Sequence, residues 1–268
     1  MALPALKKNE LQAAAPLLES NMTVLSVNVN KIALLRNSRG RDFPSVLDFA
    51  KRVIDLGVAG ITVHPRPDER HVTRRDIREL TSFLADYPQV EFNIEGYPSE
   101  EFLDLVINAQ PHQCTLVPDA PDQLTSDHGW DIAANEALLK NVLARLRENE
   151  IRSSIFLDPD PAAVDLVPSV EADRIELYTE DYAQAFGGAD QDSVLEKYRV
   201  TAARAAKLGI GVNAGHDLDL KNLGEFLTVP NVLEVSIGHA LVVESLYTGV
   251  DEVVKRYLAI CEQADPLA

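Results

Sequence analysis

Short apolar runs alternate along this chain with longer segments of helical periodicity, and the alternation repeats eight times. The runs are rich in Val, Ile and Leu and are bounded by Gly, Pro or polar residues, which is typical of parallel strands buried on both faces. They span Val24–Asn30, Ala59–Pro65, Val90–Gly96, Gln113–Pro118, Arg152–Pro159, Arg174–Thr179, Gly209–His216 and Val232–His239. The pattern predicts an α/β fold, a (β/α)8 TIM barrel.

The segments between the runs carry start and stop signals of helices. Residues 46–56 place four apolar side chains on one helical face, and Gly57 follows as a stop. Thr73 and Asp76 have the spacing of a capping box, and Ser99 precedes two glutamates in the same manner. Each strand is therefore expected to lead into a helix.

Length and composition agree with a single catalytic barrel. The chain has 268 residues, 46 % of them hydrophobic, which suits one barrel of residues 24–268 preceded by an extension of residues 1–23. The first residues lack the apolar region of a secretory signal, and no run is long enough to cross a membrane. Cys114 and Cys261 have no paired spacing and are expected to be buried hydrophobes. We therefore expect a cytoplasmic protein.

The net charge of −17 argues against nucleic acid or an anionic membrane as a partner, because either requires an exposed basic face. A phosphorylated small molecule remains compatible, since it needs only a local cluster of donors. Basic residues cluster after the first two strands, at Lys31, Arg36, Arg39, Arg41, Arg66, Arg70, Arg74 and Arg75. Arg41, Arg74 and Arg75 are interpreted as solvent-facing helix residues, whereas Arg39 and Arg66 suit a phosphate.

The predicted strand ends carry residues that can do chemistry. In a TIM barrel these ends form the catalytic rim. They bear Asn28, Asn30, His64, Arg66, Glu95, Asp158, Glu176, His216 and His239. Any one of them could simply be a solvated polar residue. The last two strands, however, end in the near-copies VNAGHDL and VSIGHAL, and phosphate sites of barrels often lie after strands seven and eight. Together with the basic cluster, this predicts two anionic groups bound at one rim.

These stretches resemble the pyridoxine 5′-phosphate synthase family over most of the chain, from Val24 to the final helix. The resemblance rests on N-x-N-K-I-A-x-L-R-N-x-R-G at Asn28–Gly40, G-I-T-V-H-x-R-x-D-x-R-H at Gly60–His71, N-I-E at Asn93–Glu95, V-N-A-G-H at Val212–His216 and I-G-H-A at Ile237–Ala240. It implies a homo-octamer that condenses 3-amino-2-oxopropyl phosphate with 1-deoxy-D-xylulose 5-phosphate. The products would be pyridoxine 5′-phosphate, phosphate and water.

The resemblance also implies residue roles. His64 and Glu95 would accept protons, His216 would donate one, and Glu176 would stabilise a transition state. The amino-ketone phosphate would be held by Asn28, Arg39, Asp217, Gly238 and His239, and the deoxyxylulose phosphate by Asn30, Lys31, Arg66, His71 and Thr125. Histidine and a buried glutamate suit proton transfer near neutral pH, and the substrate supplies its own amine. No metal or other cofactor is therefore expected, and Lys31 is interpreted as a charge and not as a Schiff-base lysine.

Five positions depart from the commonest family pattern and indicate a divergent subgroup. Asn30 and Lys31 stand in place of Asp-His, Asp217 in place of Gly, and Tyr178 and Glu180 in place of His and Gly. A carboxylate at position 217 is unfavourable beside a phosphate unless it points away or is protonated.

Two other functions stay open on the sequence alone. One is a metal-dependent barrel hydrolase with His64, His216, His239 and Glu95 as ligands, although the surplus of arginine favours anions. The other is a catalytically inactive barrel that binds phosphorylated ligands. The segments 119–135 and 180–192 are long enough to form lids that exclude water from imine intermediates, although 180–192 is equally well read as an ordinary surface loop.

Overall fold

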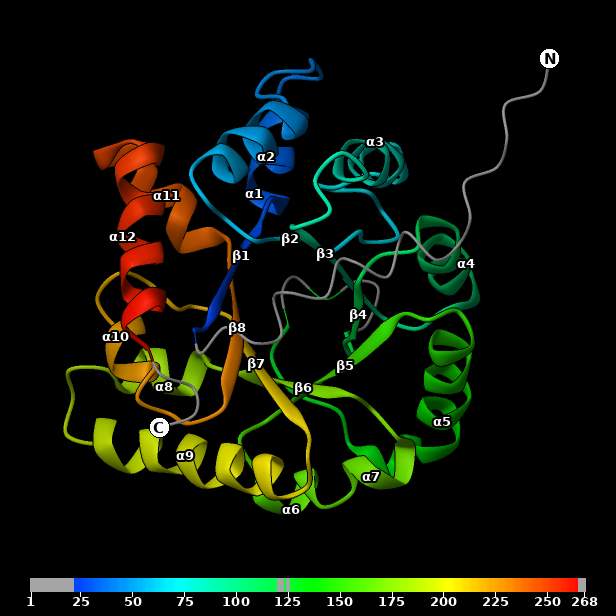
Figure 1. The fold of residues 1–268 in the computed structure, drawn as a ribbon, viewed down its shortest axis with the longest axis vertical. Helices are drawn as coiled ribbons and strands as arrows, with labels where there is room; N and C mark the ends of the chain where they lie inside the picture. Colours follow the sequence, from blue (N-terminus) through cyan, green and yellow to red (C-terminus); the bar gives the residue numbers. More distant parts are fainter. Residues whose placement is uncertain (1–21, 120–122, 124–125, 265–268) are drawn as a thin grey trace.

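The computed structural model describes residues 22–119, 123 and 126–264. Eight parallel strands form a closed barrel in which each strand pairs with the next and β1 pairs with β8 (Figure 1). The strands are β1 Val24–Asn28, β2 Gly60–Val63, β3 Glu91–Gly96, β4 Gln113–Leu116, β5 Arg152–Leu157, β6 Arg174–Tyr178, β7 Gly211–Gly215 and β8 Val232–Ile237. The predicted (β/α)8 barrel is confirmed.

The helices surround the barrel as an outer layer (Figure 1). They are α1 Asn30–Asn37, α2 Val46–Asp55, α3 Arg74–Leu84, α4 Glu100–Ala109, α5 Ile132–Glu148, α6 Pro161–Val164, α7 Val167–Val170, α8 Glu180–Ala185, α9 Gln191–Lys207, α10 Leu223–Phe226, α11 His239–Thr248 and α12 Val250–Gln263. The capping box of Thr73 and Asp76 is present at α3, and the Ser99 side chain caps α4. Among the described residues, no helix is long and apolar enough to span a bilayer.

Charged side chains fill the barrel interior at the end where the strands begin. Arg152, the first residue of β5, donates to Glu91 Oε1 at 3.0 Å and to Gln113 Oε1 at 2.9 Å. Arg174, the first residue of β6, lies 3.8 Å from the Glu234 carboxylate. Because charged groups are stable in an interior only when they are paired, these contacts close this end of the barrel with matched charges.

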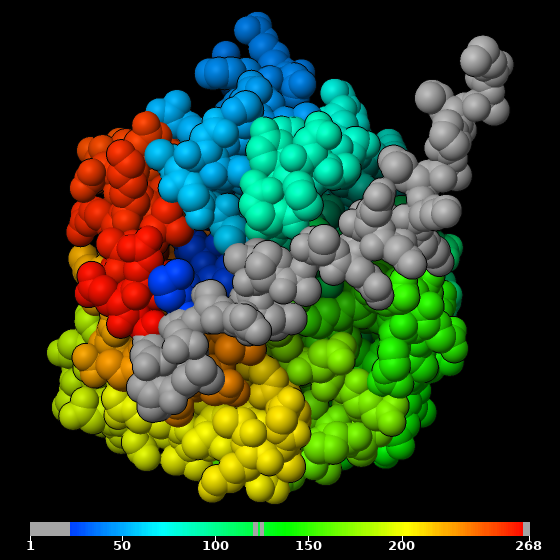
Figure 2. Space-filling view, in the orientation of Figure 1, coloured from blue at the N-terminus to red at the C-terminus, as the bar shows by residue number. Residues whose placement is uncertain are grey.

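The segment between α1 and α2 projects beyond the rest of the molecule, as the blue tip in Figures 1 and 2 shows. The Phe43 side chain on this segment is 81 % exposed.

Trp130 fixes the segment that leads into α5. Its indole nitrogen donates to the Leu116 carbonyl at 2.9 Å, at the end of β4, and its ring stacks on Tyr97 with centroids 6.0 Å apart. The preceding Gly129 is required by packing, because a Cβ there would lie 2.4 Å from the Asp158 backbone nitrogen. The end of β4 and the start of α5 are therefore locked together.

Candidate active site

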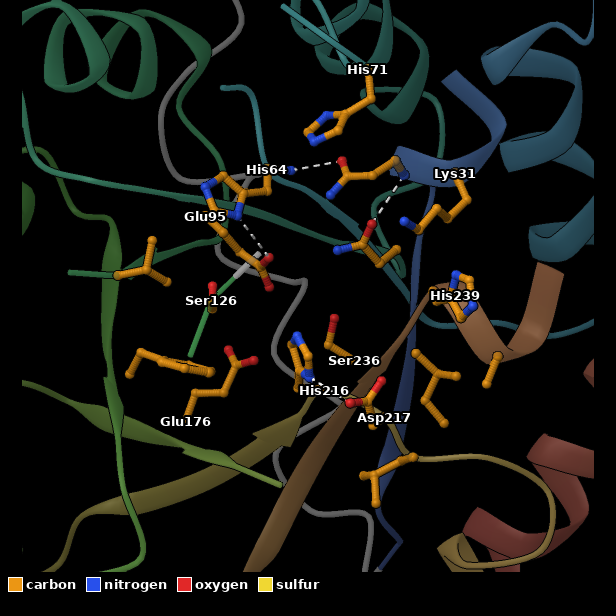
Figure 3. A pocket seen from close by; sticks show the side chains of 18 of the residues that line it. Lys31, His64, His71, Glu95, Ser126, Glu176, His216, Asp217, Ser236 and His239 are labelled. Carbon is orange, nitrogen blue, oxygen red and sulfur yellow. Dashed lines mark hydrogen bonds and ion pairs between the residues drawn. The ribbon is translucent and has the colours of Figure 1, made fainter. Parts of the chain in front are cut away.

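A cavity of about 600 Å³ opens at the carboxyl ends of the strands (Figure 3). It brings together twelve of the fourteen residues that the sequence nominates. These are Asn28, Asn30, Lys31, His64, Arg66, His71, Glu95, Glu176, His216, Asp217, Gly238 and His239. The two segments that the sequence nominates for phosphate binding and the acid–base candidates thus line a single cavity.

The other two nominated residues are not placed in this cavity. Arg39 is exposed in the turn that follows α1 and does not line the cavity. The structure therefore does not bring Arg39 to the other candidates within one chain. Thr125 lies outside the described residues.

His64 and Glu95 form an acid–base pair inside the cavity. His64 follows β2 and Glu95 is the fifth residue of β3, and His64 Nδ1 lies 4.0 Å from Glu95 Oε2 (Figure 3). The His64 backbone is held by the Asn30 side chain, whose oxygen accepts from the His64 N–H at 3.0 Å. Burial, aided by the nearby Arg66 charge, lowers the pKa of His64 well below its ordinary value. The ring is therefore neutral near pH 7, which is the form that accepts a proton.

Glu95 and Glu176 are buried carboxyl groups with raised pKa values. Burial raises the pKa of Glu95 well above its ordinary range, and the Glu176 charge adds to the effect. Burial likewise raises the pKa of Glu176 to about 8. Gly215 makes room for Glu176, since a Cβ there would lie 2.5 Å from Glu176 Oε1. Glu176 can therefore exchange a proton near neutral pH, and the pKa of Glu95 is displaced in the same direction.

Arg66 and His71 present donors to the same side of the cavity. The Arg66 guanidinium donates to Asp119 Oδ2 at 2.6 Å, and both side chains are buried. Ser126, which also lines the cavity, donates to the same oxygen at 2.7 Å. The His71 Nδ1 atom accepts from the Val72 N–H at 2.9 Å. Burial and Arg66 lower the pKa of His71 to about 4, so its neutral ring carries its proton on Nε2 and can donate there.

Two helix starts also border the cavity. Asn30 and Lys31 begin α1, and Gly238 and His239 form the start of α11. Neither N-cap residue, Val29 or Gly238, caps its helix with a side chain, and at α1 the Asn30 N–H donates to Asn28 Oδ1 at 3.0 Å. Backbone N–H groups at a helix start attract anions, so each start is suited to a phosphate.

His216 and Asp217 follow β7 in an unusual backbone conformation. Both have positive φ, 85° and 56°, in the region that non-glycine residues rarely adopt. The Asp217 carboxylate is turned to its neighbour, with Oδ2 3.0 Å from His216 Nδ1 (Figure 3). The Tyr178 ring packs edge-on against the His216 ring at 5.0 Å between centroids. The Asp217 carboxylate is thus turned toward His216.

Several residues of the cavity carried no role in the sequence analysis. Ser126 and Ser236 line it, and so do Arg70 and Glu180, while Asp119 anchors Arg66 from behind. In the sequence, Arg70 belongs to the basic cluster, and Asp119 begins the long segment after β4. Nothing in the sequence marks Ser236, because serine is common at strand ends.

One group of potential metal ligands occurs within the described ranges. The ligand atoms of Glu180, His216 and Asp217 lie within 4.8 Å of one another at the cavity rim. This is not the set that the hydrolase alternative requires, since His64, Glu95 and His239 are not part of it. Exposed acidic groups of this kind are common without a metal, so the group assigns no metal site.

The family profile described as pyridoxal phosphate biosynthesis protein PdxJ matches residues 25–263. The chain belongs to this family. A pyridoxine 5′-phosphate synthase of Christiangramia forsetii is 50 % identical over 240 residues, covering 89 % of this chain and 99 % of the relative. That of Bacteroides thetaiotaomicron is 50 % identical over 237 residues, covering 88 % and 98 %. The predicted membership in a family of vitamin B6 biosynthetic enzymes is confirmed.

Solved structures add the fold alone. Phosphoribosyl anthranilate isomerase of Thermotoga maritima matches with a TM-score of 0.59 at 12 % identity, over 90 % of this chain and 99 % of that chain. A 4-hydroxy-2-oxoglutarate aldolase/2-deydro-3-deoxyphosphogluconate aldolase matches with a TM-score of 0.58 at 14 % identity, over 92 % and 98 %. This PdxJ family member therefore shares its barrel with enzymes of very different sequence.

Proposed function

We propose that this chain is a pyridoxine 5′-phosphate synthase, which condenses 3-amino-2-oxopropyl phosphate with 1-deoxy-D-xylulose 5-phosphate. The products are pyridoxine 5′-phosphate, phosphate and water. The observation that carries the proposal is the shared cavity, where two helix starts border buried groups with displaced pKa values. Ring closure from two phosphorylated substrates requires both features in one enclosed space.

The acid–base roles are assigned as follows. His64 and Glu95 accept protons, and the neutral state of His64 supports this assignment. His216 donates a proton to a leaving oxygen. Glu176 stabilises a transition state from its buried position in the cavity. These roles need no metal or other cofactor.

Each phosphate is assigned to one helix start. The amino-ketone phosphate binds at Gly238 and His239 of α11, with Asn28 beside them; a Cβ at position 238 would lie only 3.0 Å from Asn28 Cβ. Asp217 contributes through its backbone N–H, because its carboxylate faces His216. Arg39 belongs to this group by family resemblance and must reach the cavity by movement of its exposed segment or from another copy.

The deoxyxylulose phosphate binds at the start of α1, with Asn30 and Lys31. Arg66 and the Nε2–H of His71 complete the set of donors, and the burial of Arg66 makes its hydrogen bond to an anion stronger. Thr125 is kept in this group from the family pattern. The substitution of Asn-Lys for Asp-His leaves a cation at this position, which suits a phosphate.

We also propose a cytoplasmic homo-oligomer, an octamer by family resemblance, built from the barrel of residues 24–268 with residues 1–23 as an extension. Exposed apolar side chains on the tip after α1 and on α11 support association, with Phe43, Leu246 and Tyr247 exposed by 81 %, 73 % and 89 %. Buried thiols at Cys114 and Cys261 suit a reducing compartment. Sedimentation analysis of the purified full chain tests the assembly, and a monomer at micromolar concentration would contradict it.

Purified protein mixed with both substrates tests the activity. We expect pyridoxine 5′-phosphate, detected by ultraviolet absorbance and mass, only when both substrates are present. The assay is run in chelator and again with added divalent cations. Binding of both phosphates without product would support the inactive barrel, and activity that requires the cation would revive the metal-dependent alternative.

A further inference from the structure

The side chain of Asp217 faces the proton donor and not the space where a substrate would lie. Its Oδ2 atom is 3.0 Å from His216 Nδ1, which is within hydrogen-bonding distance (Figure 3). The other ring nitrogen of His216 points into the cavity, on the side of Glu95 (Figure 3). The two nitrogens of one imidazole therefore have separate surroundings.

The backbone around this pair is held in place from two sides. Thr179 Oγ1 lies 2.7 Å from the Gly215 carbonyl and also contacts the His216 carbonyl, and Asn222 Nδ2 donates to the Asp217 carbonyl at 3.1 Å. Positive φ values at two consecutive non-glycine residues cost about 1–3 kcal/mol each. Such a conformation persists only when its surroundings enforce it, so the fold holds the backbone that carries the two side chains in this arrangement.

We propose that Asp217 is a positioning residue that fixes the tautomer of His216, so that Nε2 alone exchanges the proton that reaches the substrate. The inference rests on the donor role of His216 in the proposed function. In the neutral ring, Nδ1 keeps its proton and donates it to Asp217. The hydrogen bond with His216 holds the pKa of Asp217 below its ordinary value, so the carboxylate is ionised and able to accept.

The donating step balances without any further reactant. His216 enters it as the imidazolium, with protons on both nitrogens. The Nε2–H bond breaks and its electron pair stays on the ring, while an O–H bond forms on the hydroxyl of the substrate carbinolamine. The C–O bond then breaks as water leaves, and the lone pair of the adjacent substrate nitrogen forms the C=N bond. The ring ends neutral with its proton on Nδ1, still bound to Asp217. The carboxylate stays ionised throughout, as in other His–carboxylate pairs.

The tautomer is measured directly on the whole protein labelled with ¹⁵N-histidine, at a pH where the His216 ring is neutral. We expect the proton on Nδ1 in the unsubstituted protein. In Asp217→Gly we expect it to move to Nε2; glycine suits the positive φ, so the loop keeps its path. His128, which contacts Asp127 outside the cavity, serves as the internal control and should not change. A proton on Nε2 in the unsubstituted protein would overturn the proposal.

Kinetics give the second readout. We expect Asp217→Gly to lower kcat about 10- to 100-fold with the KM of both substrates changed less than about twofold. Asp55→Asn removes a carboxylate from the exposed face of α2 and should leave kcat unchanged. An unchanged kcat would overturn the proposal. If the KM alone were raised, Asp217 would be assigned to phosphate binding instead. Because the tautomer is read without turnover, an unsubstituted protein that makes no product would refute the proposed function and not this inference.

Discussion

Two carboxyl groups at opposite ends of the barrel interior, Glu91 and Glu95, have pKa values displaced in opposite directions. Where the strands begin, burial alone would raise the pKa of Glu91, but the hydrogen-bonded Arg152 guanidinium holds it below its ordinary value. At the cavity, Glu95 has the Asn93 amide at 3.5 Å and the His64 ring at 4.0 Å, and its pKa is raised. The Glu91 carboxylate, paired with an arginine, contributes to the fold. The Glu95 carboxyl group, which has no such partner at hydrogen-bonding distance among the described residues, is available for proton transfer.

The largest effect is expected from the reacting pair at the cavity. His64→Ala and Glu95→Gln should each lower kcat about a thousandfold, because each removes a proton acceptor from the chemical step. The thermal unfolding midpoint should stay near that of the unsubstituted protein, since neither side chain closes the barrel. Product is measured by absorbance and mass. Turnover near the original rate in either variant would contradict the acid–base assignment.

A smaller effect is expected on stability at Glu176. Its pKa is about 8 in the folded protein against an ordinary value of 4.5, so the folded state binds the proton more tightly than the unfolded chain. The contribution of Glu176 to the free energy of unfolding is therefore fully present below pH 4.5 and is lost as the pH rises to 8.

Glu176→Gln removes this dependence. At pH 8 the variant should be more stable than the unsubstituted protein by roughly 3 kcal/mol, and near pH 5 the two should agree. Urea unfolding at both pH values measures the difference. Equal differences at pH 5 and pH 8 would show that Glu176 is ionised in the folded protein.

The smallest effect is expected at the opposite end of the barrel, with the reverse dependence on pH. Glu91→Gln leaves the Arg152 charge without its carboxylate and should cost about 2 kcal/mol at pH 7. Because the pKa of Glu91 is lowered, its contribution is present above pH 4.5 and disappears at more acid pH. The kcat of the folded variant should not change. Lost activity without lost stability would mean that the two ends are not separate in function.

The sequence predicts the barrel and the residue content of its rim well, because both depend on local patterns. Buried parallel strands are continuous apolar runs, and their carboxyl ends must share one rim, so His64, Glu95 and His216 are brought together by topology alone. Glu176 lies in the middle of the buried strand β6, where position alone would not mark it, and its role is implied only by the family resemblance. The capping box at Thr73 follows from spacing in the same way.

What the sequence does not predict is where side chains point. Arg39 belongs to a segment that the sequence nominates for phosphate binding, but its side chain is exposed and does not line the cavity. The contact between Asp217 and His216 depends on positive φ values at both residues, which the sequence pattern does not predict. The pairing of Arg152 with Glu91 joins residues 61 positions apart, from two strands that are not adjacent in the barrel.

Trp130 gives the chain an optical signal of its own. It is the single tryptophan of the sequence, so indole fluorescence comes from one ring. That ring is 5 % exposed and hydrogen-bonded to the last residue of β4, one residue before the cavity-lining Val117. Its emission colour and quenching therefore report on events at the mouth of the barrel without a dye or a label. Substrate arrival and product departure can be timed in a stopped-flow instrument with the unmodified protein.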